Sequence, residues 1–146
     1  ELFNSKEAFD RELISIINQD GAELIVLAGY MRVLTPLFIS NYFGKILNIH
    51  PSLLPKFPGL NTHQKAIDAS EKIHGASVHF VTDKLDGGPI ICQESVTIEA
   101  IDTAKTLSDK VLKKEHIIFP KVIHWYTQRR LKLINNTSAT LDGKKI

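Results

Sequence analysis

Apolar residues recur along this chain at two different spacings, one typical of helices and one typical of strands. Between residues 5 and 18 they fall three or four positions apart, which predicts an amphipathic helix with Ser5 as its N-cap. Residues 24–28 are instead continuously apolar, and so short a run predicts a central parallel strand that is covered on both faces. A further run, residues 46–50, is halted by Pro51 and predicts a second buried strand.

The rest of the chain continues this alternation of helices and strands. The order favours an α/β fold with a doubly wound, mostly parallel sheet, and the length of 146 residues favours a single domain over 1–146. Further helices are expected at 35–44, at 61–70 and from 102 onward, and Pro120 is expected to kink or interrupt the last of them. Further strands are expected at 76–81 and 89–98, followed by a terminal hairpin at 130–134 and 139–141.

Two polar side chains interrupt the apolar run that ends before Pro51. Because side chains alternate along a strand, Asn48 and His50 are expected on one face, with Ile49 opposite. An amide donor and a titratable imidazole at the carboxyl end of a buried strand suit a reaction in which charge develops on a carbonyl oxygen while a proton moves. The structural alternative is a turn-forming asparagine and a histidine bonded to its own loop.

Two later carboxylates also have two interpretations. Asp86 precedes Gly87 and Gly88, which would let the backbone approach a ligand closely, but a plain hairpin turn is the simpler explanation from composition alone. Glu115 lies among apolar residues of the last predicted helix, either as a surface position or as a buried group with a cationic partner.

Composition excludes several classes of protein. The net charge is only +2 and the basic residues are dispersed, so no nucleic-acid surface is expected. Cys92 is the only cysteine, which excludes an intramolecular disulfide and disfavours a cysteine-based zinc site. No apolar run is long enough to span a bilayer and no signal peptide opens the chain, so we expect a cytoplasmic protein with no membrane partner.

Two blocks of sequence, NIHPSLLP at 48–55 and HGASVHFVTDKLDGGPII at 74–91, closely resemble the phosphoribosylglycinamide formyltransferase family. The similarity runs from about residue 5 to about residue 143, and the two blocks keep the family's spacing of 36 positions between His50 and Asp86. The resemblance implies a three-layer α/β fold and transfer of a formyl group from 10-formyltetrahydrofolate to the amine of glycinamide ribonucleotide in de novo purine biosynthesis. It implies no metal.

The resemblance assigns the catalytic trio to Asn48, His50 and Asp86. In that assignment, Asn48 and a protonated His50 stabilise the tetrahedral oxyanion, and His50 also donates a proton. A carboxylate beside an imidazole favours its charged form, so Asp86 is expected to favour protonation of His50. Asp86 is also a candidate to relay a proton from the attacking amine through water.

The resemblance also implies binding residues for both small molecules. Folate is expected to contact a loop, an apolar slot for the pterin, the backbone that borders the pterin's edge, and a basic residue near the glutamate tail. The ribonucleotide is expected near Pro51, with His79 facing it and Glu115 holding its amine. The predicted folate residues are Met31, Arg32, Val33 and Leu34 in the loop, Leu27, Phe38, Ile39, Ile46 and Val81 in the slot, Thr82 and Asp83 at the edge, and Lys6 near the tail.

One departure from the family pattern bears on the fold. The family opens with a strand, a Gly-Asn-Ser phosphate loop and a helix, and this sequence begins at a later helix. Without those elements the sheet would expose an edge, so association through that edge is expected. Completion by another chain, a cleaved or shortened form, and self-association are three explanations that the sequence does not separate.

Three alternatives to this function come from related or reduced activities. A 10-formyltetrahydrofolate deformylase would use a similar His and Asp, although Pro51 after His50 and Gly87-Gly88 after Asp86 favour the transferase pattern. A methionyl-tRNA formyltransferase shares the Ser-Leu-Leu-Pro block, but no basic tRNA-binding extension is present in the sequence. A folate-binding fragment without turnover is the third alternative.

Overall fold

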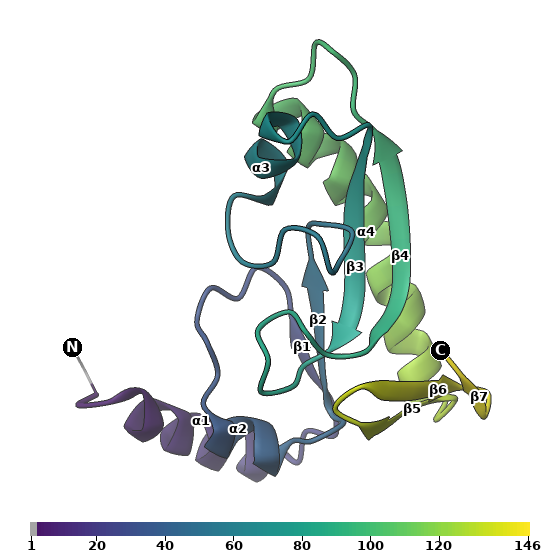
Figure 1. Ribbon diagram of the computed structural model, residues 1–146. Helices are drawn as coiled ribbons and strands as arrows, with labels where there is room; N and C mark the ends of the chain where they lie inside the picture. Colours follow the sequence, from purple (N-terminus) through teal and green to yellow (C-terminus); the bar gives the residue numbers. More distant parts are fainter. Residues whose placement is uncertain (1–2) are drawn as a thin grey trace.

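The computed structural model describes residues 3–146, which form two sheets and four helices (Figure 1). Most predicted elements are present, with boundaries shifted by a few residues. In chain order the elements are α1 Lys6–Asp20, β1 Ile25–Leu27, α2 Pro36–Asn41, β2 Ile46–His50, α3 Thr62–Asp68, β3 Ile73–Phe80, β4 Ile90–Thr97, α4 Ala104–Thr127, β5 Leu131–Asn135, β6 Ser138–Leu141 and β7 Lys144–Lys145.

The main sheet is mixed and has the strand order β1-β2-β3-β4. β1 and β2 pair in parallel, as a helical crossover between them requires. β2 pairs with β3, and β3 with β4, in antiparallel fashion. The α/β class is confirmed, and the described part of the sheet has a larger antiparallel share than the sequence pattern predicted.

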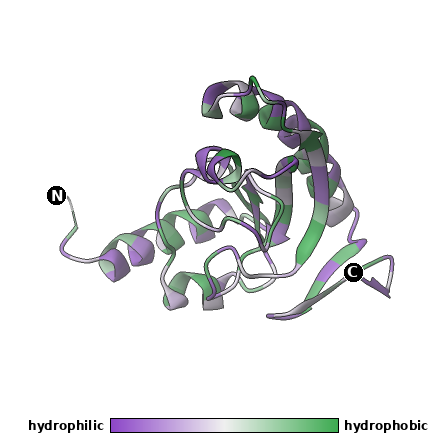
Figure 2. Ribbon diagram, turned by 45° about the horizontal axis from the view of Figure 1, so that its top comes forward, coloured by the Kyte–Doolittle hydropathy of each residue, from purple (hydrophilic) through white to green (hydrophobic). Residues whose placement is uncertain are grey.

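Helices cover both faces of this sheet, which makes three layers. Alternate residues of β2 and β3, among them Leu47, Val78 and Phe80, pack with α4 into one core. On the other face, Ile46 packs with Phe38 of α2 and with residues of α1 in a second core. Figure 2 shows green and purple alternating along α1 and α4, as expected for helices that bury one side.

β1 departs from its prediction, because it is an edge strand rather than a central one. It pairs only with β2 among the described residues, and the side chain of Val26 is 41% exposed. A continuously apolar strand is buried on both faces only when other elements of the fold pack against each face. The expected association through this edge stays a prediction.

α4 runs unbroken through Pro120 for 24 residues, so of the two predicted effects of this proline the interruption is wrong and the kink stays a prediction. A capping box between Thr103 and Thr106 fixes its start. The predicted terminal hairpin is confirmed as β5 and β6, and β7 adds a short third strand to it.

The proline-containing segment 51–59, here called the proline loop, is tied to the polar face of β3. The Ser77 hydroxyl donates to the Ser52 carbonyl at 2.6 Å and accepts from the Leu54 N–H at 3.0 Å. Gln93 of β4 donates to both the Leu54 carbonyl and the Ser77 hydroxyl, at 2.9 and 2.8 Å. These buried hydrogen bonds hold the loop directly after His50.

His74 joins the proline loop and α3 to the start of β3. Its ring is 1% exposed and lies edge-on to Phe57 of the proline loop. Burial, and next the neighbouring His63, lowers the pKa of His74 to about 4, although a hydrogen bond to the Pro51 carbonyl acts in the opposite direction. The ring is therefore neutral at pH 7.

We predict that His74 makes the folded state sensitive to acid. Between pH 6.5 and pH 4 the unfolded chain binds a proton at this ring that the folded chain does not, so stability present above pH 6.5 is lost as the pH falls toward 4. The wild type should therefore lose roughly 2 kcal/mol more of its free energy of unfolding than His74→Gln between pH 7 and pH 4.5, measured by urea unfolding.

The matched control is His124→Gln, which changes an exposed histidine on α4 and should follow the wild type. An identical acid response in wild type and His74→Gln would contradict the prediction.

Candidate active site

Register between β2 and β3 places four polar side chains on one face of the sheet. Asn48 lies directly opposite His79, and His50 lies directly opposite Ser77. Such cross-strand neighbours have Cβ atoms about 5 Å apart. The prediction that Asn48 and His50 share a face, with Ile49 in the core behind them, is confirmed.

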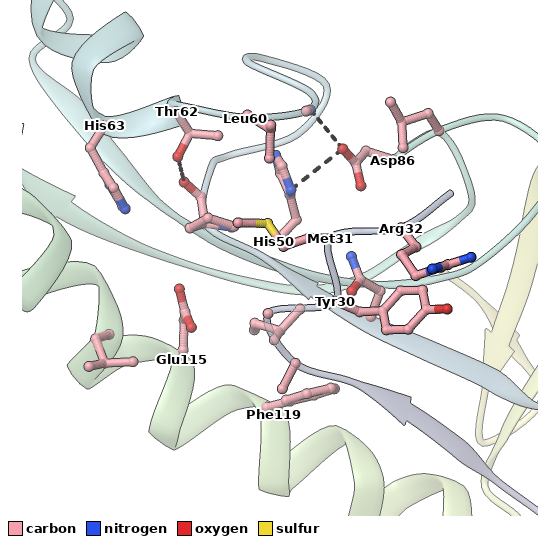
Figure 3. Close-up of a pocket in the computed structure, with 18 of the residues that line it drawn as sticks. Tyr30, Met31, Arg32, His50, Leu60, Thr62, His63, Asp86, Glu115 and Phe119 are labelled. Atoms are coloured by element: carbon pink, nitrogen blue, oxygen red, sulfur yellow. Dashed lines mark hydrogen bonds and ion pairs between the residues drawn. The ribbon is translucent and has the colours of Figure 1, made fainter. Parts of the chain in front are cut away.

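Asp86 reaches the same place from the connection between β3 and β4. Its Oδ2 lies 3.5 Å from His50 Nδ1, and its Oδ1 lies 3.7 Å from His79 Nε2 (Figure 3). His79 Nε2 in turn lies 3.1 Å from Asn48 Nδ2. The structure thus brings together the amide, the imidazole and the carboxylate that the sequence analysis singled out.

Both ring nitrogens of His50 face oxygen acceptors. Nε2 lies 2.9 Å from the carbonyl oxygen of Phe57, and Nδ1 faces the Asp86 carboxylate. A carbonyl oxygen only accepts, so Nε2 carries a proton. Nδ1 is close enough to the carboxylate to form an ion pair whenever the ring carries a second proton.

Asp86 is held by its backbone conformation as well as by its side-chain partners. It has φ of 48°, in the left-handed region, and its Oδ2 accepts the Gly59 N–H at 2.8 Å. Burial raises the pKa of Asp86, but the hydrogen bonds from His79 and Gly59, together with the nearby His50 and His79 charges, bring it below its ordinary value. The side chain is therefore a carboxylate at neutral pH.

His79 couples Asn48 to Asp86 and offers little surface to a substrate. The ring is 2% exposed, and its Nδ1 donates to the Phe80 carbonyl at 2.8 Å. Nε2 in a neutral ring accepts from Asn48, and in a charged ring it donates to Asp86. His79 thus contacts two members of the trio, and its predicted contact with the ribonucleotide stays a prediction.

A large cavity of about 1000 Å³ opens beside the trio. It is bounded by the segment after β1, the end of β2, the proline loop, the start of α3 and one side of α4. Met31, Pro51 and Glu115, each expected near a substrate, line this cavity. Glu115 is half-buried, which lies between its two interpretations, and burial raises its pKa with His116 acting against it.

A narrower cavity of about 80 Å³ lies on the other side of the trio. Asn48 and Asp86 line both cavities, so the trio lies where the two meet. The predicted folate residues that line the narrow cavity are Leu27, Arg32, Val33, Leu34, Ile39, Val81, Thr82 and Asp83.

The remaining predicted folate residues lie elsewhere. Phe38 and Ile46 are each 1% exposed inside the second core and line neither cavity, so their contact with a folate stays a prediction. Apolar character alone does not distinguish a slot wall from the core behind it. Met31 lines only the large cavity, and Lys6 is an exposed residue of α1 that lines neither, so its contact with a folate tail stays a prediction.

Several groups that the sequence did not reveal also border the site. His63 of α3 lines the large cavity, and Tyr30 lines both cavities with its hydroxyl buried and without a hydrogen-bond partner in the described structure. The Phe57 carbonyl and the Gly59 N–H are backbone groups, which no side-chain pattern can indicate. For His63, the only available signal was its position directly after the start of a predicted helix beside the proline loop.

No group of three His, Cys, Asp or Glu side chains within residues 3–146 is arranged to hold a metal ion. None of the helices in this range combines the length and apolar character needed to cross a bilayer.

Comparison with known proteins agrees with this geometry. A phosphoribosylglycinamide formyltransferase from Escherichia coli is 51% identical over 144 residues, which cover 99% of this chain and 68% of that protein. The solved structure of a protein with the same name from Coxiella burnetii superposes with a TM-score of 0.93 at 49% identity, covering 99% of this chain and 67% of its own. A formyltetrahydrofolate deformylase from Pseudomonas syringae superposes with a TM-score of 0.83 at 28% identity, covering 90% of this chain and 44% of its own.

A family model described as formyl transferase matches residues 1–123. That match extends over most of the chain and includes Asn48, His50 and Asp86. With the relative at 51% identity, it shows that this chain belongs to the formyl transferase family.

Proposed function

We propose that the protein transfers the formyl group of 10-formyltetrahydrofolate to the amine of glycinamide ribonucleotide, a step of purine biosynthesis. The observation that carries the proposal is the position of Asn48 and Asp86 at the junction of a narrow cavity and a large one, with His50 beside them in the large cavity. A transfer between two substrates needs one binding region for each and the reacting groups between them.

In this proposal the narrow cavity takes the pterin and the large cavity takes the ribonucleotide. The narrow cavity has apolar walls from β1 and α2 and backbone groups of the segment after β3. The large cavity has room for a ribonucleotide and carries polar groups, among them Glu115 and His63, on the side away from Asp86. The formyl carbon would lie between the cavities, next to Asn48.

The chemistry follows from the groups at the junction. The amine nitrogen attacks the formyl carbon, and the carbonyl electron pair becomes an oxyanion that the Asn48 amide and a His50 N–H stabilise. Collapse of this intermediate breaks the bond to the folate nitrogen, which takes a proton that His50 can supply. The amine loses one proton, for which the nearby Asp86 carboxylate is the acceptor, directly or through water.

His50 must release one of its present partners to play this role. Its Nε2 is occupied by the Phe57 carbonyl, and its Nδ1 faces Asp86. The proline loop carries Phe57, so a formyl oxygen can replace that carbonyl on His50 if the loop moves outward. The pairing with Asp86 is then kept during the reaction, and the N–H on Nε2 becomes the donor.

Deformylation of the same folate is the second candidate, and it would use water in place of the amine. The solved deformylase is less similar to this chain, at 28% identity against 49% for the transferase structure. A large cavity with buried polar groups beside the trio also favours an organic acceptor over water. Assays for formylated ribonucleotide and for free formate separate the two reactions, and calorimetry with a non-hydrolysable folate analogue identifies binding without turnover.

The first prediction concerns His50. His50→Ala should lower kcat for formyl transfer by about 10³-fold, because one donor to the oxyanion and one proton donor are lost together. Affinity for the folate analogue should stay within tenfold, because the folate walls are untouched. Steady-state assay and calorimetry measure the two quantities, and His124→Ala is the matched control. Turnover within tenfold of the wild type would refute the role of His50.

The second prediction isolates the charge of Asp86. Asp86→Asn keeps an oxygen that can accept the Gly59 N–H but removes the negative charge beside His50. We expect kcat to fall by about 10²-fold or more, and the fraction of doubly protonated His50 at pH 6.5 to fall, as read from the ¹⁵N NMR signals of its ring. Asp109→Asn, an exposed carboxylate on α4, should change neither quantity. An unchanged protonated fraction in Asp86→Asn would count against the pairing.

A further inference from the structure

The connection between β1 and α2, residues 28–34, forms part of the walls of both cavities and is here called the wall segment. Among the residues that the structure describes, no backbone hydrogen bond is made to or from this segment. Its position therefore depends on its two ends and on side-chain contacts. One end continues directly from β1, and the other leads into α2 through Thr35.

The end of the wall segment next to α2 is held by a buried carboxylate of α1. Asp10 is 3% exposed, and its Oδ2 accepts both the Thr35 N–H at 2.9 Å and the Thr35 hydroxyl at 2.7 Å. Thr35 is the N-cap of α2, and its hydroxyl oxygen accepts the Phe38 N–H at 3.3 Å. A hydroxyl has one proton, so donation to Asp10 leaves its lone pairs free for Phe38. One carboxylate thus fixes the end of the wall segment and supports the start of α2.

The residue before Asp10 holds the middle of the same segment. The guanidinium carbon of Arg32 lies 4.0 Å from the centroid of the Phe9 ring, in the range of a cation–π contact. Arg32 lines both cavities. The helix that carries Phe9 and Asp10 is itself fixed, because it lies beside α2 and packs into the second core (Figure 1).

The two ends of the wall segment border different cavities. Ala28 and Gly29, next to β1, line only the large cavity, whereas Leu34, next to Thr35, lines only the narrow one. Loss of the tie between Asp10 and Thr35 would free the end at the narrow cavity while β1 still holds the other end. The tie should therefore affect the narrow cavity more than the large one.

We propose that Asp10 is a positioning residue for the narrow cavity, because through Thr35 it holds the wall segment where the folate substrate needs it. The inference rests on the proposed function, in which the narrow cavity takes the pterin. Asp10 lines neither cavity, so it acts only through the groups it holds. A site whose wall is in place for only a fraction of the time binds its ligand more weakly in proportion to that fraction.

The first test measures the tie itself and needs no substrate. Amide hydrogen exchange, followed by NMR, should be slow at Thr35 in the wild type and about tenfold faster or more in Asp10→Ala, which removes the acceptor. The amide of Val78 in the core strand β3 is the reference for global unfolding in each variant. Glu7→Gln, which changes an exposed carboxylate of the same helix, should leave both rates unchanged. An unchanged rate at Thr35 relative to Val78 in Asp10→Ala would overturn the tie.

The second test separates binding of the two substrates. Asp10→Ala should bind the non-hydrolysable folate analogue about tenfold more weakly, with KM for glycinamide ribonucleotide and kcat at saturating folate within about threefold of the wild type. Calorimetry and steady-state assay measure these quantities, with Glu7→Gln as the control. Unchanged affinity for the analogue, or an equal loss in kcat, would overturn the positioning role.

Variants of Thr35 test whether Asp10 acts through this residue. Thr35→Val removes the hydroxyl and should weaken analogue binding, whereas Thr35→Ser keeps both donors and should bind like the wild type. The double variant of Asp10→Ala and Thr35→Val should bind about as weakly as the weaker single variant, and additive losses would overturn the proposal. If Asp10→Ala does not fold, Thr35→Val compared with Thr35→Ser still decides the question. Absence of folate binding in the wild type would instead overturn the proposed function, and the exchange result would stand.

Discussion

The antiparallel register between β2 and β3 is the constraint on which the site depends. It is fixed on the core side, where Leu47, Ala76, Val78 and Phe80 are buried against α4. A slip of one residue would turn these side chains to the opposite face and move the polar set into the core. Burial of the apolar face therefore determines that Asn48 meets His79 on the other face. The geometry of the reacting groups follows from hydrophobic packing behind them.

The polar face then imposes its own requirement, because each buried polar group needs a partner. Ser77 and Gln93 satisfy backbone groups of the proline loop, and that loop supplies the Phe57 carbonyl to His50 and the Gly59 N–H to Asp86. The polar face of the sheet thus holds the loop in place, and the loop covers the reacting groups. Its Phe57 carbonyl accepts the His50 N–H that the proposed reaction directs at the formyl oxygen.

The sequence predicts what depends on local periodicity and misses what depends on neighbours. Alternation along residues 46–50 correctly predicted a strand with Asn48 and His50 on one face. The same kind of evidence misassigned β1, because no property of residues 24–28 tells whether both faces and both edges are covered. Ile46 and Leu27 look alike in the sequence, yet one lies in the core and the other lines a cavity. The pairing of His63 with His74 was also hidden, since it depends on how α3 packs against β3.

Three histidines of this site show why residue type alone does not assign a chemical role. His50 faces the Asp86 carboxylate through Nδ1 and donates from Nε2 to the Phe57 carbonyl. His74 is 1% exposed and contacts another imidazole, and burial lowers its pKa to about 4, so it is neutral at pH 7. His63 makes that contact with His74 but borders the large cavity, so its ring is within reach of a ligand there. Chemical difference among identical side chains therefore arises from burial and from the groups that the fold places around each ring, such as the Phe57 carbonyl and the Asp86 carboxylate at His50.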